Sequence, residues 1–162
     1  MDLNAQIPGA PNFKWIEFIR SNTADRRGID NTPRDQSVFS RIEYLADNVL
    51  QPLRNEFGPI KINSGYRSAA LNRALGSNNK SFHAYGMAAD IVPLAKGVTT
   101  KDLFVYIHDN LPYTELIAED VPDGWVHVAL ERGREKEHQL KYKRVGGSVQ
   151  RGTYEQILRM FA

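Results

Sequence analysis

Two histidines and one aspartate are the residues of this chain best suited to metal chemistry. His83 and Asp90 lie within the segment 81–90, and His127 lies far downstream in the segment 125–128. Two imidazoles and a carboxylate form a three-ligand set for a transition metal, which leaves one coordination position open. A structural zinc site normally has four ligands and is rich in cysteine, and this chain has no cysteine. The ligand set therefore indicates a catalytic metal centre, with zinc as the expected metal.

The residues around these ligands follow the two-residue period of a β-strand. Trp125, His127 and Ala129 fall on one face of their strand, and Ala88 shares the face of Asp90. The two alanines leave a hollow beside the polar side chains, as a metal and a substrate require. The alternative is that each histidine is a hydrogen-bonded core residue and the aspartate a turn acceptor. An unpaired carboxylate inside an apolar strand is costly, which favours the metal site.

Hydrophobic periodicity and turn residues predict the elements that position these ligands. Helices are expected over residues 12–20, 33–57, 68–75, 100–110 and 154–161, with Thr32-Pro33 starting the second helix, Pro52 kinking it and Gly58-Pro59 ending it. Strands are expected over 60–63, 87–92, 115–119 and 125–130, with an edge strand at 141–145. Because helices come early and strands late, we expect a single α+β domain over 1–162. Its small antiparallel sheet carries the metal site and packs against helices mostly from the N-terminal half.

Composition places few demands on partners. The chain has 162 residues, 41% hydrophobic and 25% charged, with a formal net charge of +2. We therefore expect no nucleic-acid or membrane partner and a monomer. The basic segment 132–151 is predicted to be a solvated face, with weak attraction to an anionic polymer as the alternative. The N-terminus lacks the basic and apolar stretches of a signal peptide, so synthesis in the cytoplasm is expected.

Several spaced motifs resemble the zinc D-Ala-D-Ala carboxypeptidase family, whose fold is hedgehog-like. They are Ser64-Gly65-Tyr66-Arg67-Ser68, Ser81-x-His83-x-x-Gly86-x-Ala88-x-Asp90 and Trp125-x-His127. A phage-associated, endolysin-type branch is also similar in Asn12-Phe13, Asp30-Asn31-x-Pro33 and Leu50-Gln51-Pro52-Leu53-Arg54. The resemblance runs from about residue 12 to about residue 130.

The resemblance implies roles for individual residues. His83, Asp90 and His127 would hold one zinc ion, and Arg67 would bind the substrate carbonyl or the developing oxyanion. Ser81 would orient the ligand loop, although a plain helix or turn cap also explains it. The remaining substrate-binding candidates are Tyr66, Tyr85 and Trp125, and Trp125 has a core position as its alternative.

The general base departs from the family pattern. Many relatives place an acidic residue three positions before the last histidine, and here that position is Gly124. Glu119, at the end of the preceding strand, is the first choice for the base. Asp123 is the second choice and Asp120 the third, and both have turn formation as their alternative.

The implied function is a zinc metallopeptidase, a carboxypeptidase or endopeptidase that hydrolyses peptidoglycan stem peptides. Zinc would activate water and a carboxylate would take its proton. The implied biology is phage or prophage lysis, reached through a holin pore, with a virion component or a host wall-remodelling enzyme as alternatives. One alternative is an inactive zinc-containing module that binds cell walls or builds a virion. Another is a non-haem iron oxygenase, which uses the same ligand types. The helical first half and the lack of a His-x-Asp pair disfavour the oxygenase.

Overall fold

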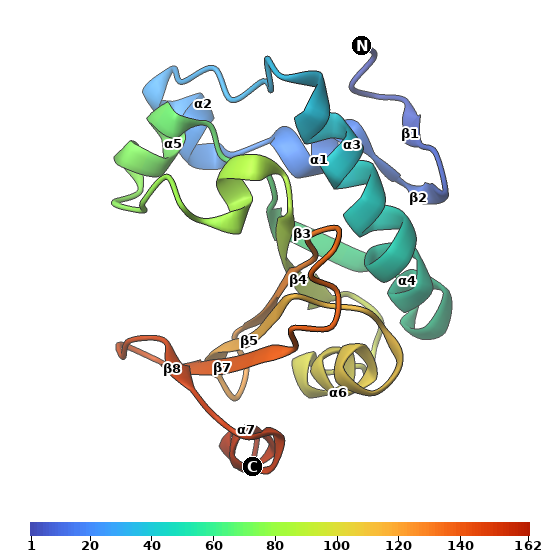
Figure 1. Ribbon diagram of the computed structural model, residues 1–162, viewed down its shortest axis with the longest axis vertical. Coiled ribbons are helices and arrows are strands. Elements are labelled where there is room, and N and C mark those ends of the chain that lie inside the picture. The colour runs from blue at the N-terminus through green and yellow to red at the C-terminus, as the bar shows by residue number, and fades with distance from the viewer.

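The computed structural model describes residues 1–162. Its N-terminal part is mostly helical and wraps one side of the molecule (Figure 1). In chain order the elements are β1 (Gln6–Ile7), β2 (Ala10–Lys14), α1 (Trp15–Ile19), α2 (Asn22–Arg27), α3 (Gln36–Leu45), η1 (Ala46–Leu50), α4 (Gln51–Phe57), β3 (Ile60–Ser64) and α5 (Ala69–Ala74).

The second half supplies most of the sheet. Its elements are η2 (Phe82–Tyr85), β4 (Ala88–Pro93), α6 (Thr100–Asn110), β5 (Glu115–Val121), β6 (Trp125–Ala129), β7 (Gln139–Arg144), β8 (Gln150–Arg151) and α7 (Tyr154–Met160). The six strands of the main sheet run in the order β3-β4-β6-β5-β7-β8. All neighbours are antiparallel except β5 and β7, which run parallel. The α+β fold is therefore confirmed, with one parallel pair added.

The prediction that residues 141–145 form an edge strand is wrong in its position. The segment 139–144 lies between β5 and β8, so β8 forms the edge of the sheet instead. The chain reaches this parallel position through the loop after β6, and at the start of β7 Gln139 N donates to Thr114 O. Sequence periodicity identifies a strand but carries no signal for which neighbour it pairs with.

The first expected helix is also shorter than predicted. Residues 10–14 form β2, paired with β1, and only Trp15–Ile19 is helical. The Lys14 amide donates to the Glu17 side chain, which fixes the helix start at Trp15. Arg20 is extended, and Ser21 then caps α2, a helix that the sequence analysis did not predict.

The long helix begins at Gln36, so the predicted start at Thr32-Pro33 is wrong. Asp35 is the cap, because its carboxylate accepts from Ser37 N at 2.9 Å. Thr32 instead belongs to a turn in which its amide donates to Asp30. Near the predicted kink at Pro52, the helix contains the π-helical turn η1 just before α4. It ends at Gly58, as expected.

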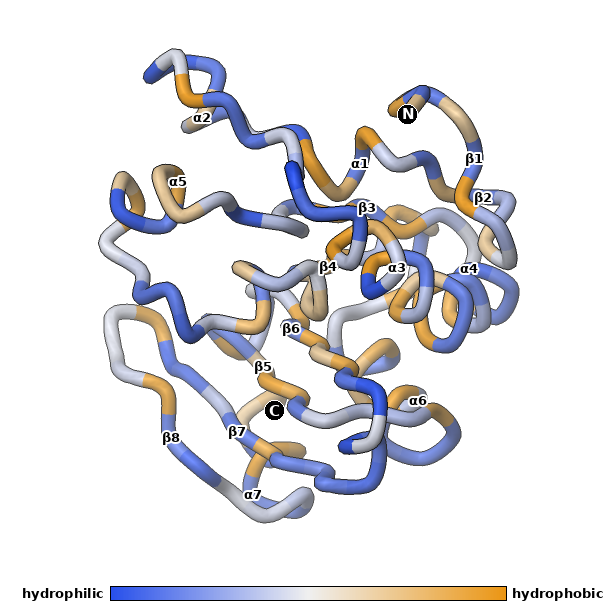
Figure 2. The backbone as a smooth tube through the Cα atoms, turned by 45° about the horizontal axis from the view of Figure 1, so that its top comes forward, coloured by the Kyte–Doolittle hydropathy of each residue, from blue (hydrophilic) through white to orange (hydrophobic).

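The two faces of the sheet differ in chemistry. One face carries Ala89, Ile91, Val126, Val128 and the other apolar residues of a 29-residue core cluster shared with α1, α3, α4 and α6. In the tube drawing, hydrophobic and hydrophilic stretches alternate along α3, α4 and α6, as in helices with one apolar face (Figure 2). None of the helices combines the length and the apolar character needed to cross a bilayer.

The opposite face carries the polar residues. The register pairs Asp90 with His127 across β4 and β6, and His127 with Ile117 across β6 and β5. Ala88 pairs with Ala129 beside them, which confirms the predicted shared face and its small residues.

The turn after β3 is anchored to α1 by close backbone contact. Tyr66 N donates to Phe18 O at 2.7 Å, and a Cβ added at Gly65 would lie 2.5 Å from the same oxygen. The buried Asn31 side chain closes this junction, because its amide donates to Ile19 O and Tyr66 O and its oxygen accepts from Ser68 N. The glycine is therefore required by proximity, and the turn is held rigidly.

Replacing Gly65 with alanine is expected to lower the free energy of unfolding by more than about 2 kcal/mol, because the new methyl group meets backbone atoms that cannot move aside. The control is Gly28→Ala, at a position with φ of +63° and nothing within 4 Å of the added atom. It should cost only about 1 kcal/mol of backbone strain. Chemical denaturation of both variants checks the difference, and equal losses would contradict the close contact.

Candidate metal centre

Three buried ligand atoms meet on the open face of the sheet. Asp90 Oδ1 lies 2.9 Å from His127 Nδ1 and 3.3 Å from His83 Nε2, and the two nitrogens are 3.2 Å apart. The side chains come from η2, β4 and β6 and can together hold a metal ion. The structure thus brings together the three residues that the sequence analysis singled out as ligands.

The His83 ring is oriented by the turn after β3. Its Nδ1 lies 2.7 Å from Gly65 O, which can only accept, so Nδ1 carries the proton and Nε2 presents its lone pair to the site. Ser81 caps η2 by accepting from His83 N at 3.3 Å. The same hydrogen bond fixes the start of the segment that carries His83. The two roles considered for Ser81, a cap and an orienting residue, therefore rest on one interaction.

The His127 ring is oriented from the other side by Glu115. Its Nε2 lies 3.0 Å from Glu115 Oε1, which leaves Nδ1 facing Asp90 and His83. Glu115 in turn forms an ion pair with Lys141 of β7. The sequence analysis missed both residues. The two-residue strand period could have identified Glu115, because it lies two positions before Ile117, the residue opposite His127. Lys141 reaches Glu115 only through the parallel pairing of β5 and β7.

The three atoms fit a tetrahedral metal such as zinc. Ligands at about 2.0–2.1 Å from such an ion lie about 3.3–3.4 Å apart, close to the separations seen here. In a neutral His83 the Nε2 lone pair faces a carboxylate and another ring nitrogen, an arrangement that a cation at their centre stabilises. Each imidazole also has the outer partner typical of metal-binding histidines.

Burial and mutual charge set the protonation of these groups. Burial lowers the pKa of His83. For Asp90, burial alone would raise the pKa, but the charges and hydrogen bonds of both histidines outweigh it and hold the pKa far below its ordinary value. For His127, burial is likewise outweighed, and the bonds to Asp90 and Glu115 raise the pKa to about 9. A proton on Nδ1 and a metal ion are therefore alternatives at His127.

Arg67 lies at the edge of this cluster. Its Nη2 is 3.2 Å from Asp90 Oδ2, the oxygen that faces away from the imidazoles, and its Nε donates to Ser64 Oγ at 2.9 Å. The guanidinium is thus held beside the ligand set, within a side chain that is only 17% exposed. The arginine that the motif singled out is at the site.

Glu119 lies on the face of the sheet that carries the metal-ligand candidates. It is opposite Trp125 in the β5–β6 register, on the same face as His127 and two residues from its partner Ile117. Burial raises the pKa of Glu119, and the negative charge of Asp90 raises it further. Its carboxylate forms no ion pair, unlike that of Glu115, which is bound on the far side of the His127 ring.

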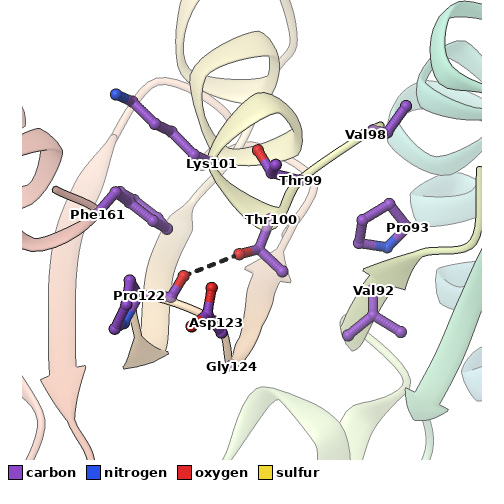
Figure 3. A pocket seen from close by; sticks show the side chains of 10 residues that line it. All are labelled: Val92, Pro93, Val98, Thr99, Thr100, Lys101, Pro122, Asp123, Gly124 and Phe161. Carbon is purple, nitrogen blue, oxygen red and sulfur yellow. Dashed lines mark hydrogen bonds between the residues drawn. The ribbon is translucent and has the colours of Figure 1, made fainter. Parts of the chain in front are cut away.

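The other two acids considered for the general base, Asp120 and Asp123, have different surroundings. Asp120 pairs with Lys143 at 3.0 Å. Asp123 is exposed in a separate cavity with Thr100, Pro122 and Phe161 (Figure 3). Position 124 has no room for an acid, because a Cβ on Gly124 would lie 2.0 Å from Glu119 O. This tight turn explains why the chain departs from the family pattern there.

The three aromatic residues expected to bind substrate differ in their exposure. Tyr66 is half-buried against the core, and Tyr85 is 45% exposed. Trp125 is half-buried at the sheet face, with Lys143 5.8 Å from its ring and a buried Nε1 that has no hydrogen-bond partner.

Replacing Glu115 with glutamine is expected to weaken Zn²⁺ affinity by about 10- to 100-fold, because outer partners of metal-binding histidines contribute on that scale. Competition with a chromogenic chelator measures the affinity. Glu155→Gln, which changes an exposed glutamate in α7, should leave it unchanged. Equal affinity in both variants would contradict an orienting role for Glu115.

Zinc binding is also expected to release about one proton per ion at pH 7.5, because the raised pKa keeps His127 protonated up to about pH 9. Affinity should fall about tenfold from pH 8 to pH 7. In metal-free protein, the same raised pKa stabilises the fold fully below about pH 6.5 and loses that effect as pH rises through about 9. Calorimetry in buffers of different ionisation enthalpy counts the protons, and heats independent of buffer would contradict this assignment.

Comparison with known proteins shows which family this chain belongs to. The chain is 29% identical over 128 residues to a zinc D-Ala-D-Ala carboxypeptidase of Streptomyces albus G, which covers 76% of this chain. The chain itself spans about half of that relative's length, with 47% covered. A sequence profile of peptidase M15 matches residues 11–129, which include all three metal-ligand candidates. The chain belongs to the peptidase M15 family.

Proposed function

We propose that this protein is a zinc metallopeptidase that hydrolyses peptide bonds in the stem peptides of peptidoglycan. The observation that carries the proposal is the three-ligand centre flanked by Arg67 and by the unpaired carboxylate of Glu119. The named activity of the Streptomyces relative supports the substrate class.

One zinc ion is the cofactor we assign to His83, Asp90 and His127. When bound, zinc supplies a Lewis acid that polarises the scissile carbonyl and lowers the pKa of water to about 7. The chain contributes an ordered ligand set, because both imidazoles are already turned toward the centre by Gly65 O and Glu115.

Glu119 is the general base in this proposal. Its raised pKa brings a carboxylate closer to the range in which it can accept a proton from water and return it to the leaving amine. No ion pair has to be broken before it acts, whereas Asp120 is bound to Lys143.

Arg67 stabilises the developing oxyanion. Its guanidinium has a free edge beyond the bonds that Nε and Nη2 make to Ser64 and Asp90. Donors of this kind contribute on the order of 3 kcal/mol in other acyl-transfer sites. Tyr66, Tyr85 and Trp125 are assigned to the groove around the peptide, and Ser81 to the loop that carries His83.

The biological setting that we propose is phage or prophage lysis, as an endolysin that reaches the wall through a holin pore. Its support is the similarity of several short motifs to a phage-associated branch of the family. We further propose a monomeric, single-domain protein over residues 1–162.

Purified peptidoglycan incubated with zinc-loaded protein should yield new peptide termini by mass spectrometry. Glu119→Gln should keep its zinc and lose about two orders of magnitude or more in turnover, in line with the contribution of a general base. Asp123→Asn is the matched control and should stay active. His127→Ala should lose both zinc and activity.

The outcomes separate the alternatives. Full activity in Glu119→Gln would move the base to Asp123 or Asp120. Intact stem peptides across several wall chemistries, with zinc bound, would favour a cell-wall-binding or virion module. Iron in place of zinc in the purified protein would reopen the oxygenase alternative.

A further inference from the structure

A polar cavity of about 550 Å³ opens beside the metal centre, along the outer edge of β3. Its walls come from the segment between α1 and α2, from β3, from the turn that carries Arg67, and from α5. A volume of this size is within the range of ligand sites in proteins. Apart from Tyr66 and Arg67, its lining residues have no role toward the substrate so far.

Arg67 links the cavity to the ligand set. Ser64 and Arg67 both line the cavity, and they are joined by the bond from Arg67 Nε to Ser64 Oγ. Through Nη2 the same guanidinium contacts Asp90. A peptide that passes Arg67 at the metal centre can therefore extend into the cavity.

The cavity walls are fixed to one another. α2 and α5 lie side by side (Figure 1), and Arg27 Nη1 of α2 donates to Ala74 O at the end of α5 at 3.1 Å. The floor is β3, whose neighbour β4 carries Asp90. The space therefore lies between elements that are bonded to one another, beside the strand that carries Asp90.

The charged side chains that line the cavity are all positive. Arg20, just after α1, and Lys61, on β3, both line it, both are exposed, and neither forms an ion pair. No carboxylate is among the twelve lining residues. On the β7 side of the sheet, by contrast, Lys141 and Lys143 are neutralised by Glu115 and Asp120. Two unpaired cations in a polar hollow are suited to bind an anion.

We propose that this cavity, the Arg20–Lys61 subsite, binds a carboxylate of the stem peptide next to the scissile bond. The inference rests on the proposed function, which supplies a peptide substrate. Stem peptides carry free carboxylates both on the D-glutamyl residue and at the chain end, and both have the chemistry that the two cations recognise. The subsite fixes the register of the peptide against the metal centre, and with it the bond that is cut.

The test uses the zinc-loaded full chain and three synthetic peptides. The first is L-Ala-γ-D-Glu-L-Lys-D-Ala-D-Ala, the second has the D-glutamyl α-carboxylate amidated, and the third has an amidated C-terminus. Calorimetry measures Kd, and mass spectrometry measures cleavage separately. The variants are Arg20→Gln, Lys61→Gln and their combination, with the exposed Lys96→Gln as a control for loss of one surface charge.

The double variant is expected to bind the first peptide about 5- to 10-fold more weakly, while Lys96→Gln binds it as the wild type does. One of the amidated peptides should bind the wild type more weakly by a similar factor and be insensitive to the double variant. Which of the two behaves this way identifies the carboxylate. Zinc content should be the same in all variants.

Three results would overturn the subsite. They are equal affinity of the wild type for all three peptides, an equal loss of affinity for all three in the double variant, or no binding of any peptide at millimolar concentration. Charge-dependent binding without cleavage would support the subsite while sinking the peptidase. Cleavage with unchanged KM in the double variant would sink the subsite and leave the peptidase in place.

Discussion

The burial of one carboxylate, Asp90, is the constraint on which the rest of the site depends. An isolated charge inside a strand would be strongly unfavourable, so its surroundings must compensate. Both oxygens are therefore engaged, Oδ1 by two imidazoles and Oδ2 by Arg67. A metal ion bound by these three residues would replace the proton on His127 and keep the compensation in place. The same interactions that make the carboxylate tolerable thus assemble the metal centre.

Each imidazole is held by a partner from a different part of the fold. Contact between α1 and the turn after β3 places Gly65 O against His83, and the parallel strand β7 places Lys141 against the Glu115 that holds His127. Lys141 lies beyond the residues matched by the family profile. The C-terminal part of the chain therefore supports the centre without supplying a ligand.

The cavity proposed to bind substrate differs in charge from the β7 side of the sheet. On the β7 side the lysines are paired with acids, whereas the cavity along β3 keeps its cations free. The turn between β5 and β6 is too tight for a side chain at position 124, and Glu119, on the same face as His127, forms no ion pair. The proposed base on β5 and the proposed subsite along β3 thus lie on opposite sides of β4 and β6, with Arg67 between the cavity and Asp90.

Local patterns in the sequence determined the ligand types, the strands that carry Asp90 and His127, and the shared face of Ala88 and Ala129, because strand period and residue chemistry are local properties. The same is true of the helix over 100–110. Only the tertiary structure decided the parallel pairing of β7, the start of α3 at Gln36 and the contacts of Asn31, Glu115 and Lys141. These depend on contacts between residues far apart in the chain, whose partners are selected by packing and charge in the folded molecule.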